Sequence, residues 1–132
     1  EGNDHYWWGR GYEADVIVDD DASPTSWDLL HVTAGVSASQ LWLRQQGNDL
    51  EISIIGTADR ITVQNWYLGA PNRIEVIYLD NGQFLRQNDV QPLVDAMAGL
   101  AIPAAGQFDL PSPHAGQLAG VIAVNWQWPA DY

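Results

Sequence analysis

Hydrophobic and polar residues alternate in short stretches through the first part of the chain, and turn-forming residues separate these stretches. Alternation with a period of two is typical of β-strands that have one buried face. Before residue 85, no window of about 12 residues shows the apolar spacing of a helix. We therefore expect strands at residues 6–8, 15–18, 28–32, 40–45, 50–55, 60–66, 73–79 and 83–85.

Two turn sequences indicate antiparallel hairpins. Residues 46–49, Gln-Gly-Asn-Asp, connect two of the expected strands, and both Gly and Asn tolerate the positive φ that a tight hairpin turn needs. Asn81-Gly82 lies between Ile77 and Phe84 and suits a two-residue type I′ turn. We expect turns of this kind to join the later strands into an antiparallel β meander.

The pattern changes near Asn88, where apolar residues recur at helical spacing. Asp89 suits the N-cap of a helix, and Pro92 is tolerated in the first turn. We expect one helix over residues 89–100, then a linker rich in Pro, Ala and Gly, and a weaker second helix within residues 115–126. The expected fold class is therefore mainly β, with one or two C-terminal helices as a cap.

Charge narrows the choice of partners. The chain has 17 acidic residues against five Arg and no Lys, and its formal net charge is −12. Such a chain lacks the cations that neutralise nucleic-acid phosphates, so we expect no nucleic-acid partner. Metal cations complement the charge, because Asp beside Gly or Asn offers short oxygen ligands on tight turns, as Ca²⁺ requires. The alternative is that the acidity only keeps a secreted protein soluble.

The sequence gives little support for catalysis. It contains no Cys, which excludes disulfides, thiolate zinc sites and thiol nucleophiles. His5, His31 and His114 are isolated, without the spacing of a zinc site, and the G-x-S-x-G elbow is missing. No apolar run is long enough for a membrane span. We expect a protein that is not an enzyme and has no membrane span.

Three phrases near the N-terminus, at residues 2–7, 9–17 and 28–32, place an acidic residue close to an apolar strand position. The first matches the end of the nonapeptide G-G-x-G-x-D-x-U-x, in which Gly opens tight turns and Asp and turn carbonyls hold calcium. The phrases and the acidic run that follows them supply the candidate metal ligands, which are Asp4, Asp15, Asp20, Asp28, Gly9 and Gly11.

These Asp residues have an alternative role, because an Asp side chain can also cap its own turn without a metal. Asp20 lies in the run Asp19–Asp21, whose three adjacent carboxylates repel one another unless solvent or a divalent ion relieves the repulsion. Asp49, Asp59 and Asp80 lie at turns, where we expect mainly structural roles.

A longer series of short motifs follows in order: Gly35-Val36, Leu41, Gly47-Asn48-Asp49-Leu50, Ile54, Gly56-Thr57, Asp59-Arg60-Ile61-Thr62-Val63, Asn65-Trp66, Arg73-Ile74-Glu75 and Asp80-Asn81-Gly82. This series resembles the haemolysin-type calcium-binding protein-related domain, which accompanies RTX repeats in bacterial proteins exported by type I secretion. The resemblance covers roughly residues 2–90.

The resemblance implies a short β-roll-like start that continues into the meander, with a β domain at residues 1–88 and a cap or secretion-related segment at 89–132. It further implies Ca²⁺ as the bound ion, a preceding β-roll of the parent protein as neighbour, and a secreted, extracellular bacterial location. Glu1, Glu13 and Ala14 depart from the repeat, so we expect one or two ions rather than a row of them.

Three functions remain open. In a calcium-stabilised folding and capping module, binding energy available only to the folded state becomes folding energy. In a carbohydrate-binding or adhesive module, exposed aromatic rings would stack on polysaccharide; the candidates for such rings are Trp8, Trp27, Tyr67 and Trp128, although core packing is the alternative for any Trp. A purely structural cap would seal the exposed edge of a preceding β-roll.

Overall fold

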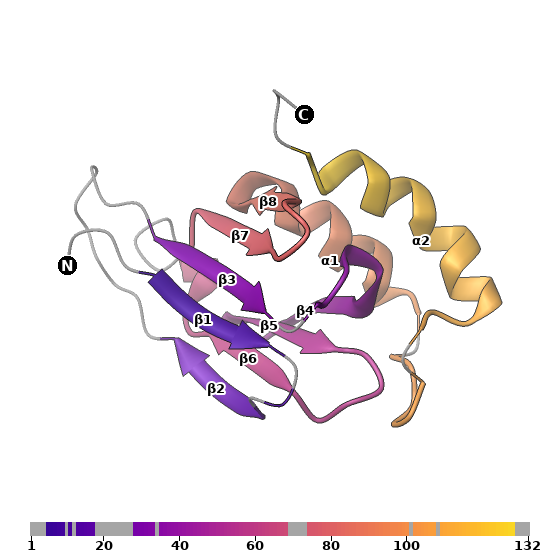
Figure 1. The fold of residues 1–132 in the computed structure, drawn as a ribbon, viewed down its shortest axis with the longest axis horizontal. Helices are drawn as coiled ribbons and strands as arrows, with labels where there is room; N and C mark the ends of the chain where they lie inside the picture. The colour runs from indigo at the N-terminus through magenta and orange to yellow at the C-terminus, as the bar shows by residue number, and fades with distance from the viewer. Residues whose placement is uncertain are drawn as a thin grey trace.

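The computed structural model describes residues 5–9, 11, 13–17, 28–33, 35–68, 74–100, 102–107 and 109–128. These residues form two four-stranded sheets and two α-helices (Figure 1). Sheet A has the order β1 (His5–Gly9), β3 (Leu29–Thr33), β7 (Val76–Leu79), β8 (Phe84–Arg86). Sheet B has the order β2 (Ala14–Ile17), β6 (Arg60–Val63), β5 (Asp49–Ile54), β4 (Leu41–Gln46).

The chain passes back and forth between the two sheets. It runs from β1 in sheet A to β2 in sheet B, returns as β3 beside β1, and later places β6 beside β2 and β7 beside β3. As a result β1, β3 and β7 are parallel neighbours, and β2 and β6 are parallel as well. The remaining pairs, β4–β5, β5–β6 and β7–β8, are antiparallel.

The expectation of a mainly β fold with a helical cap is confirmed, and each of the eight expected strands overlaps one of β1–β8. The expected antiparallel pairing of the later strands is present in β4–β5–β6 and in β7–β8, but both sheets are mixed and also contain parallel pairs. Strand β6 follows β5 within sheet B and pairs parallel with β2 on its other side, whereas β7 pairs parallel with β3 after the chain has crossed from sheet B to sheet A. Strand β6 also ends at Val63 instead of continuing to Trp66, since Asn65 adopts a φ of 61° that extended strands do not use.

The two predicted hairpins differ in outcome. The β4–β5 hairpin is confirmed, and of its two central turn residues only Gly47 has a positive φ, 62°, which is the pattern of a type II′ turn. The second connection consists of residues 80–83, in which Gly82, with φ 99°, donates its N–H to the Leu79 carbonyl at 3.1 Å. The type I′ prediction there is wrong, because that turn needs a positive φ at Asn81 as well.

One hydrophobic core joins the sheets and the helices. Trp8, Leu30, Leu43, Ile52 and Leu85 each have 0% exposure, and they come from strands of both sheets. Helices α1 (Val90–Ala98) and α2 (Ser112–Asn125) extend the same core through Leu93, Met97 and Leu118. Both predicted helices are confirmed. The division into residues 1–88 and 89–132 stays a prediction.

The edge strands at the two ends of the sheets differ in what covers them. Strands β1 and β2 are the outer strands at one end, and within the described part of the chain no further strand pairs with them (Figure 1). At the other end, α1 packs against β4, and Gln127 exchanges two backbone hydrogen bonds of 2.9 Å with Phe84 of β8. The C-terminal elements therefore close one end of the fold and leave β1 and β2 open.

Candidate calcium-binding turns

An acidic residue stands directly before each of the later parallel strands. Asp28 precedes β3 and Glu75 precedes β7 in sheet A, whereas Glu13 precedes β2 and Asp59 precedes β6 in sheet B. Because the first residues of the partner strands pair with each other, these acids also lie in register. We call Asp28 and Glu75 the sheet A acidic pair, and Glu13 and Asp59 the sheet B acidic pair.

In the sheet B acidic pair, the carboxylate of Asp59 holds the turn that leads into β2. Its two oxygens accept the N–H groups of Gly11 at 2.9 Å and Glu13 at 2.7 Å. Glu13 adopts a φ of 62°, and its carbonyl accepts the N–H of Arg60 at 3.0 Å and Nε1 of Trp8 at 3.3 Å. Asp59 is only 7% exposed, so these bonds are largely shielded from water.

The sheet A acidic pair repeats this arrangement. Oε1 of Glu75 accepts the N–H of Asp28 at 2.5 Å, and the N–H of Glu75 donates to the Asp28 carbonyl at 3.0 Å. In both pairs, the carboxylate before the later strand binds the amide of the acid before the earlier strand. The pairs differ in burial, since Asp28 is 2% exposed whereas Glu13 is exposed. Sheet A therefore brings two carboxylates to one turn, where Asp28 is buried and Glu75 is half-buried.

The chemistry of these turns suits calcium, which prefers carboxylate and carbonyl oxygens and takes about 6–8 of them. Asp28 and Glu75 are the residues that would hold such an ion in sheet A. Among the residues that the structure describes, no group of three or more His, Asp or Glu gathers closely enough to form a metal site by itself. A site at this turn would therefore need further oxygen ligands from main-chain carbonyls or from residues outside the described ranges.

The predicted metal ligands lie in different environments. Asp4 and Asp20 fall outside the described residues. Asp15 is exposed and lies within β2, one position after its first residue, so Glu13 and not Asp15 occupies the place before the strand. Asp28 does occupy that place before β3. Calcium ligation by each of these residues stays a prediction.

Gly9 and Gly11 have structural roles that the structure makes clear. Gly9 ends β1, and a Cβ atom there would lie 2.6 Å from both the carbonyl oxygen and Oγ1 of Thr33. Gly11 has a φ of 90°, a region that L side chains rarely adopt, and its N–H is bound by Asp59. Close packing thus requires glycine at position 9, and the backbone conformation favours it at position 11. Metal ligation by both residues stays a prediction.

Sequence reasoning assigned structural turn roles to three further acids, and these are confirmed. Besides Asp59, Asp49 accepts the N–H of Asn65 at 2.8 Å and Asp80 accepts the N–H of Gly35 at 3.2 Å. Glu75 was missed as a functional candidate. Its signal is the spacing Glu75-Val76-Ile77, which repeats the acid, variable, apolar order of residues 28–30.

The aromatic candidates differ in how far they are buried. Trp8 has 0% exposure, so its prediction as a ligand-facing aromatic is wrong. Alternate residues of a strand face opposite sides, and it is the neighbouring Trp7, 59% exposed, that faces outward. Tyr67 is partly buried, Trp128 is half exposed at 50%, and Trp27 lies outside the described residues. Ligand binding by Tyr67 and Trp128 stays a prediction.

Trp7 begins a row of rings that crosses the outer face of sheet A, which we call the ring ladder: Trp7, His31, Tyr78 and Phe84. The ring centroids of Trp7 and His31 lie 4.1 Å apart with an interplanar angle of 13°, and those of His31 and Tyr78 lie 5.7 Å apart at 17°. Tyr78 and Phe84 follow at 6.0 Å. Each contact joins residues that are directly opposite on neighbouring strands, so the ladder stabilises the pairing of all four strands.

His31 also contacts His5, with 3.0 Å between Nε2 of His31 and Nδ1 of His5. Burial lowers the pKa of His31, and repulsion from His5 lowers it further. The unfolded chain, in which a His has a pKa of about 6.5, therefore takes up the proton more readily than the folded chain as the pH falls. The contribution of His31 to stability is complete above pH about 6.5 and is lost as the pH falls through the lowered folded-state pKa.

We therefore expect the Tm of the wild-type chain to fall by a few degrees more than that of His31→Phe when the pH is lowered from about 7 to about 5. Phe keeps a ring between Trp7 and Tyr78 but has no proton to bind. The measurement is thermal unfolding followed by circular dichroism, and His114→Gln is the control that should follow the wild type. Equal falls for wild type and His31→Phe would contradict the prediction.

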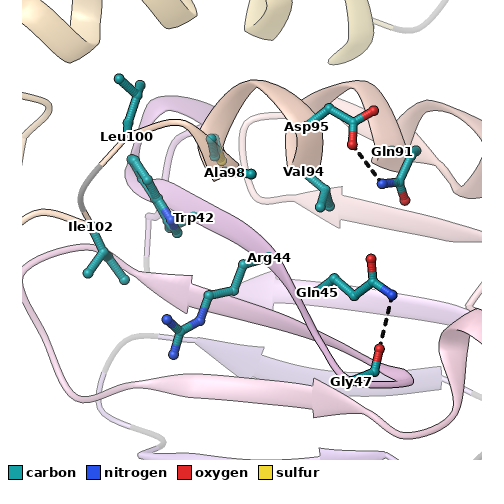
Figure 2. Close-up of a pocket in the computed structure, with 11 residues that line it drawn as sticks. Trp42, Arg44, Gln45, Gly47, Gln91, Val94, Asp95, Ala98, Leu100 and Ile102 are labelled. Carbon is teal, nitrogen blue, oxygen red and sulfur yellow. Dashed lines mark hydrogen bonds between the residues drawn. The ribbon is translucent and has the colours of Figure 1, made fainter.

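A separate groove of about 590 Å³ lies between β4 and α1 (Figure 2). Its apolar lining includes Trp42, Val94, Ala98, Leu100 and Ile102. Its polar residues bond to neighbours, since Gln91 donates to Asp95 at 2.9 Å and Gln45 donates to the Gly47 carbonyl at 3.0 Å. Arg44 forms an ion pair with Glu51. The groove is therefore lined by polar and apolar side chains in similar measure, and with Asp95 as the one carboxylate among the described residues that line it, it does not resemble a calcium site.

Comparison with known proteins identifies the central part of the chain. Residues 49–89 match the haemolysin-type calcium binding protein related domain. Over these residues the chain resembles that family. The matched region runs from β5 to the short 3₁₀ helix η4 (Gln87–Asp89), so it includes Asp59 and Glu75, the later acid of each acidic pair. The family resemblance inferred from the sequence is confirmed.

A curated relative supports the match. The iron-regulated protein FrpA of Neisseria meningitidis serogroup C is 30% identical over 92 residues, which cover 67% of this chain and 8% of FrpA. The haemolysin-type calcium binding protein related domain and its flanking segments thus span less than a tenth of this relative. In the described part of the chain, the helices are too short or too polar to cross a membrane.

Proposed function

We propose that the chain is a calcium-stabilised folding and capping module of a longer, exported bacterial RTX-type protein. The observation that carries the proposal is the pair of in-register acidic residues, Asp28 and Glu75, at a partly buried turn in a chain with a net charge of −12. The family match to a calcium binding protein related domain supports the choice of ion. The proposal contains no catalytic step.

Calcium would act mainly on sheet A. A divalent cation at this turn would bind the carboxylate oxygens of Asp28 and Glu75, which are ligands that calcium prefers. In sheet B, Glu13 is exposed and Asp59 is already bound to two amides, so this turn gains less from an ion. Where calcium is scarce, as in the cytosol, the folded state is disfavoured; where it is abundant, an ion that binds only this state adds about 2.7 kcal/mol at a hundred times its Kd.

The open edges support the capping part of the proposal. Strands β1 and β2 lie at the same end of the two sheets, and both sheets continue from them through parallel neighbours (Figure 1). A preceding β-roll would continue both sheets by placing one parallel strand beside each. Exposed strand edges promote aggregation, and the last strands of a β-roll have such edges. A fold that is open at one end and closed at the other by helices would cover them.

The test is calorimetric titration of calcium into the chelator-treated chain, with thermal unfolding measured before and after. We expect saturable binding, a rise in Tm, and about tenfold weaker binding for Asp28→Asn, a loss of about 1.4 kcal/mol. Asp95→Asn is the matched control, since Asp95 is exposed on α1 and hydrogen-bonded only within that helix. A Tm that millimolar calcium leaves unchanged would refute the calcium part of the proposal.

Polysaccharide binding is the competing function, and the exposure of Trp7 and Trp128 is the observation in its favour. The rings of Trp7 and His31 cover one face of each other, which reduces the flat surface offered to a sugar. Retardation of the chain in polysaccharide gels that is lost in Trp7→Ala and Trp128→Ala variants would support this alternative.

A further inference from the structure

The ring ladder follows a positional rule. Residues His31 and Tyr78 are each the third residue after an acid of the sheet A acidic pair, and the apolar residue before each of them, Leu30 or Ile77, is buried in the core. Trp7 lies directly opposite His31 in the parallel register, and it is the third residue after Asp4 in the sequence. Every parallel strand of sheet A therefore places a ring at the same outward position.

The ladder ends on an open ring face. One face of the Trp7 indole lies on His31 at 4.1 Å, yet Trp7 remains 59% exposed and β1 is the edge strand of the sheet. The opposite face of the indole therefore points along the sheet, beyond β1. A strand added at that edge would lie about 4.8 Å away, which falls within the 4.1–5.7 Å range of the parallel ring contacts in the ladder.

The chemistry of this edge favours a strand over a sugar. Because the rings stack on one another, the ladder turns ring edges toward solvent, and the remaining open face lies beside the outer edge of β1, which has no further strand partner among the described residues. A strand that carries a ring would hydrogen-bond to the backbone of β1 and also stack on the indole, whereas a pyranose would only stack on the indole. The four strands of sheet A also contain no Asp or Glu, so another acidic rung meets no carboxylate on this face.

We propose that a parallel strand of a preceding roll docks on β1 with an aromatic or imidazole side chain stacked on the open face of Trp7, and that this stack sets the register of docking. The inference rests on the proposed capping function and names the side chain through which it acts. A shift by one residue would turn the incoming ring into the core side, and a shift by two would place it beside His5 or Gly9 instead of Trp7.

The probe is a fusion of four consensus nonapeptides, G-G-x-G-x-D-x-U-x, placed before Glu1 of the full chain in the presence of calcium. The final x of the repeat whose strand adjoins β1 is Tyr in one fusion and Ser in the other. Amide hydrogen exchange of β1 reports strand docking, and the difference in acrylamide quenching between each fusion and its Trp7→Ser variant reports the exposure of Trp7. Leu68→Ser, which removes an apolar side chain of 60% exposure outside both sheets, is the matched control.

We expect exchange of the β1 amides to slow at least tenfold in the Tyr fusion and much less in the Ser fusion. Trp7→Ser in the Tyr fusion should behave like the Ser fusion, and Leu68→Ser should change neither readout. Equal slowing in both fusions, unaffected by Trp7→Ser, would overturn the ring contact while leaving the capping function in place. Unprotected β1 amides in both fusions would overturn the capping function itself. Dimerisation of the unfused chain that Trp7→Ser abolishes would assign the edge to a second copy and also overturn the inference.

Discussion

Trp8→Ala is expected to lower the free energy of unfolding by about 3–5 kcal/mol, whereas Trp7→Ala should lower it by about 1 kcal/mol or less. The two residues are adjacent on β1, but Trp8 has 0% exposure and packs in the core, and Trp7 is 59% exposed. Trp8 also donates Nε1 to the carbonyl of Glu13, so its loss leaves that acceptor with one bond fewer. The measurement is urea unfolding followed by circular dichroism, which gives both free energies from midpoint and slope.

Because small domains are stable by only about 5–15 kcal/mol, Trp8→Ala can leave too little folded protein for a complete curve. Trp8→Phe keeps most of the apolar volume and provides a milder variant that should fall between wild type and Trp8→Ala. Equal losses for the Trp7 and Trp8 variants would contradict the assignment of inner and outer faces of β1.

Asp59→Ala is expected to lower the free energy of unfolding by about 2–4 kcal/mol, because it leaves the amides of Gly11 and Glu13 without their acceptor. Asp59→Asn retains one acceptor oxygen and should lose about half as much. The same urea experiment measures both, and protection of β2 amides from exchange shows where the loss occurs.

Asp80→Ala is the control for this experiment. Asp80 also accepts a glycine amide, from Gly35, but the bond is 3.2 Å long and exposed to water. Its loss should therefore stay within about 1 kcal/mol. A loss for Asp59→Ala as small as that for Asp80→Ala would show that the turn before β2 does not depend on the carboxylate.

The features that sequence reasoning predicted correctly are local. The β4–β5 hairpin depends on Gly47-Asn48 between two alternating stretches, and α1 depends on a helical repeat of apolar residues that follows Asp89. The parallel pairs were missed because Leu29 and Val76 are far apart in the sequence and no turn joins them. The sequence does not show which strands become neighbours once the chain has crossed from one sheet to the other.

The candidate site shows the same division. Asp28 was found because its spacing to an apolar strand residue repeats the calcium nonapeptide, but its partner Glu75 emerges only from the register of β3 and β7. Trp7 and Trp8 illustrate a different limit. Alternation requires that they face opposite sides, but the sequence does not show which of the two faces the core. The position of the neighbouring strand β3 determines this.

The bridge between Gln127 and Phe84 has a consequence for the order in which the chain becomes structured. The two bonds that shield the edge of β8 come from a residue near the C-terminal end of the described chain, and the parallel pairs β2–β6 and β3–β7 also join distant segments. Contacts of such high sequence separation slow folding, because loop closure must precede the favourable pairing. During synthesis the edge of β8 therefore stays unprotected until Gln127 has emerged. A fold built from local contacts could form earlier, so this chain should stay unfolded for longer.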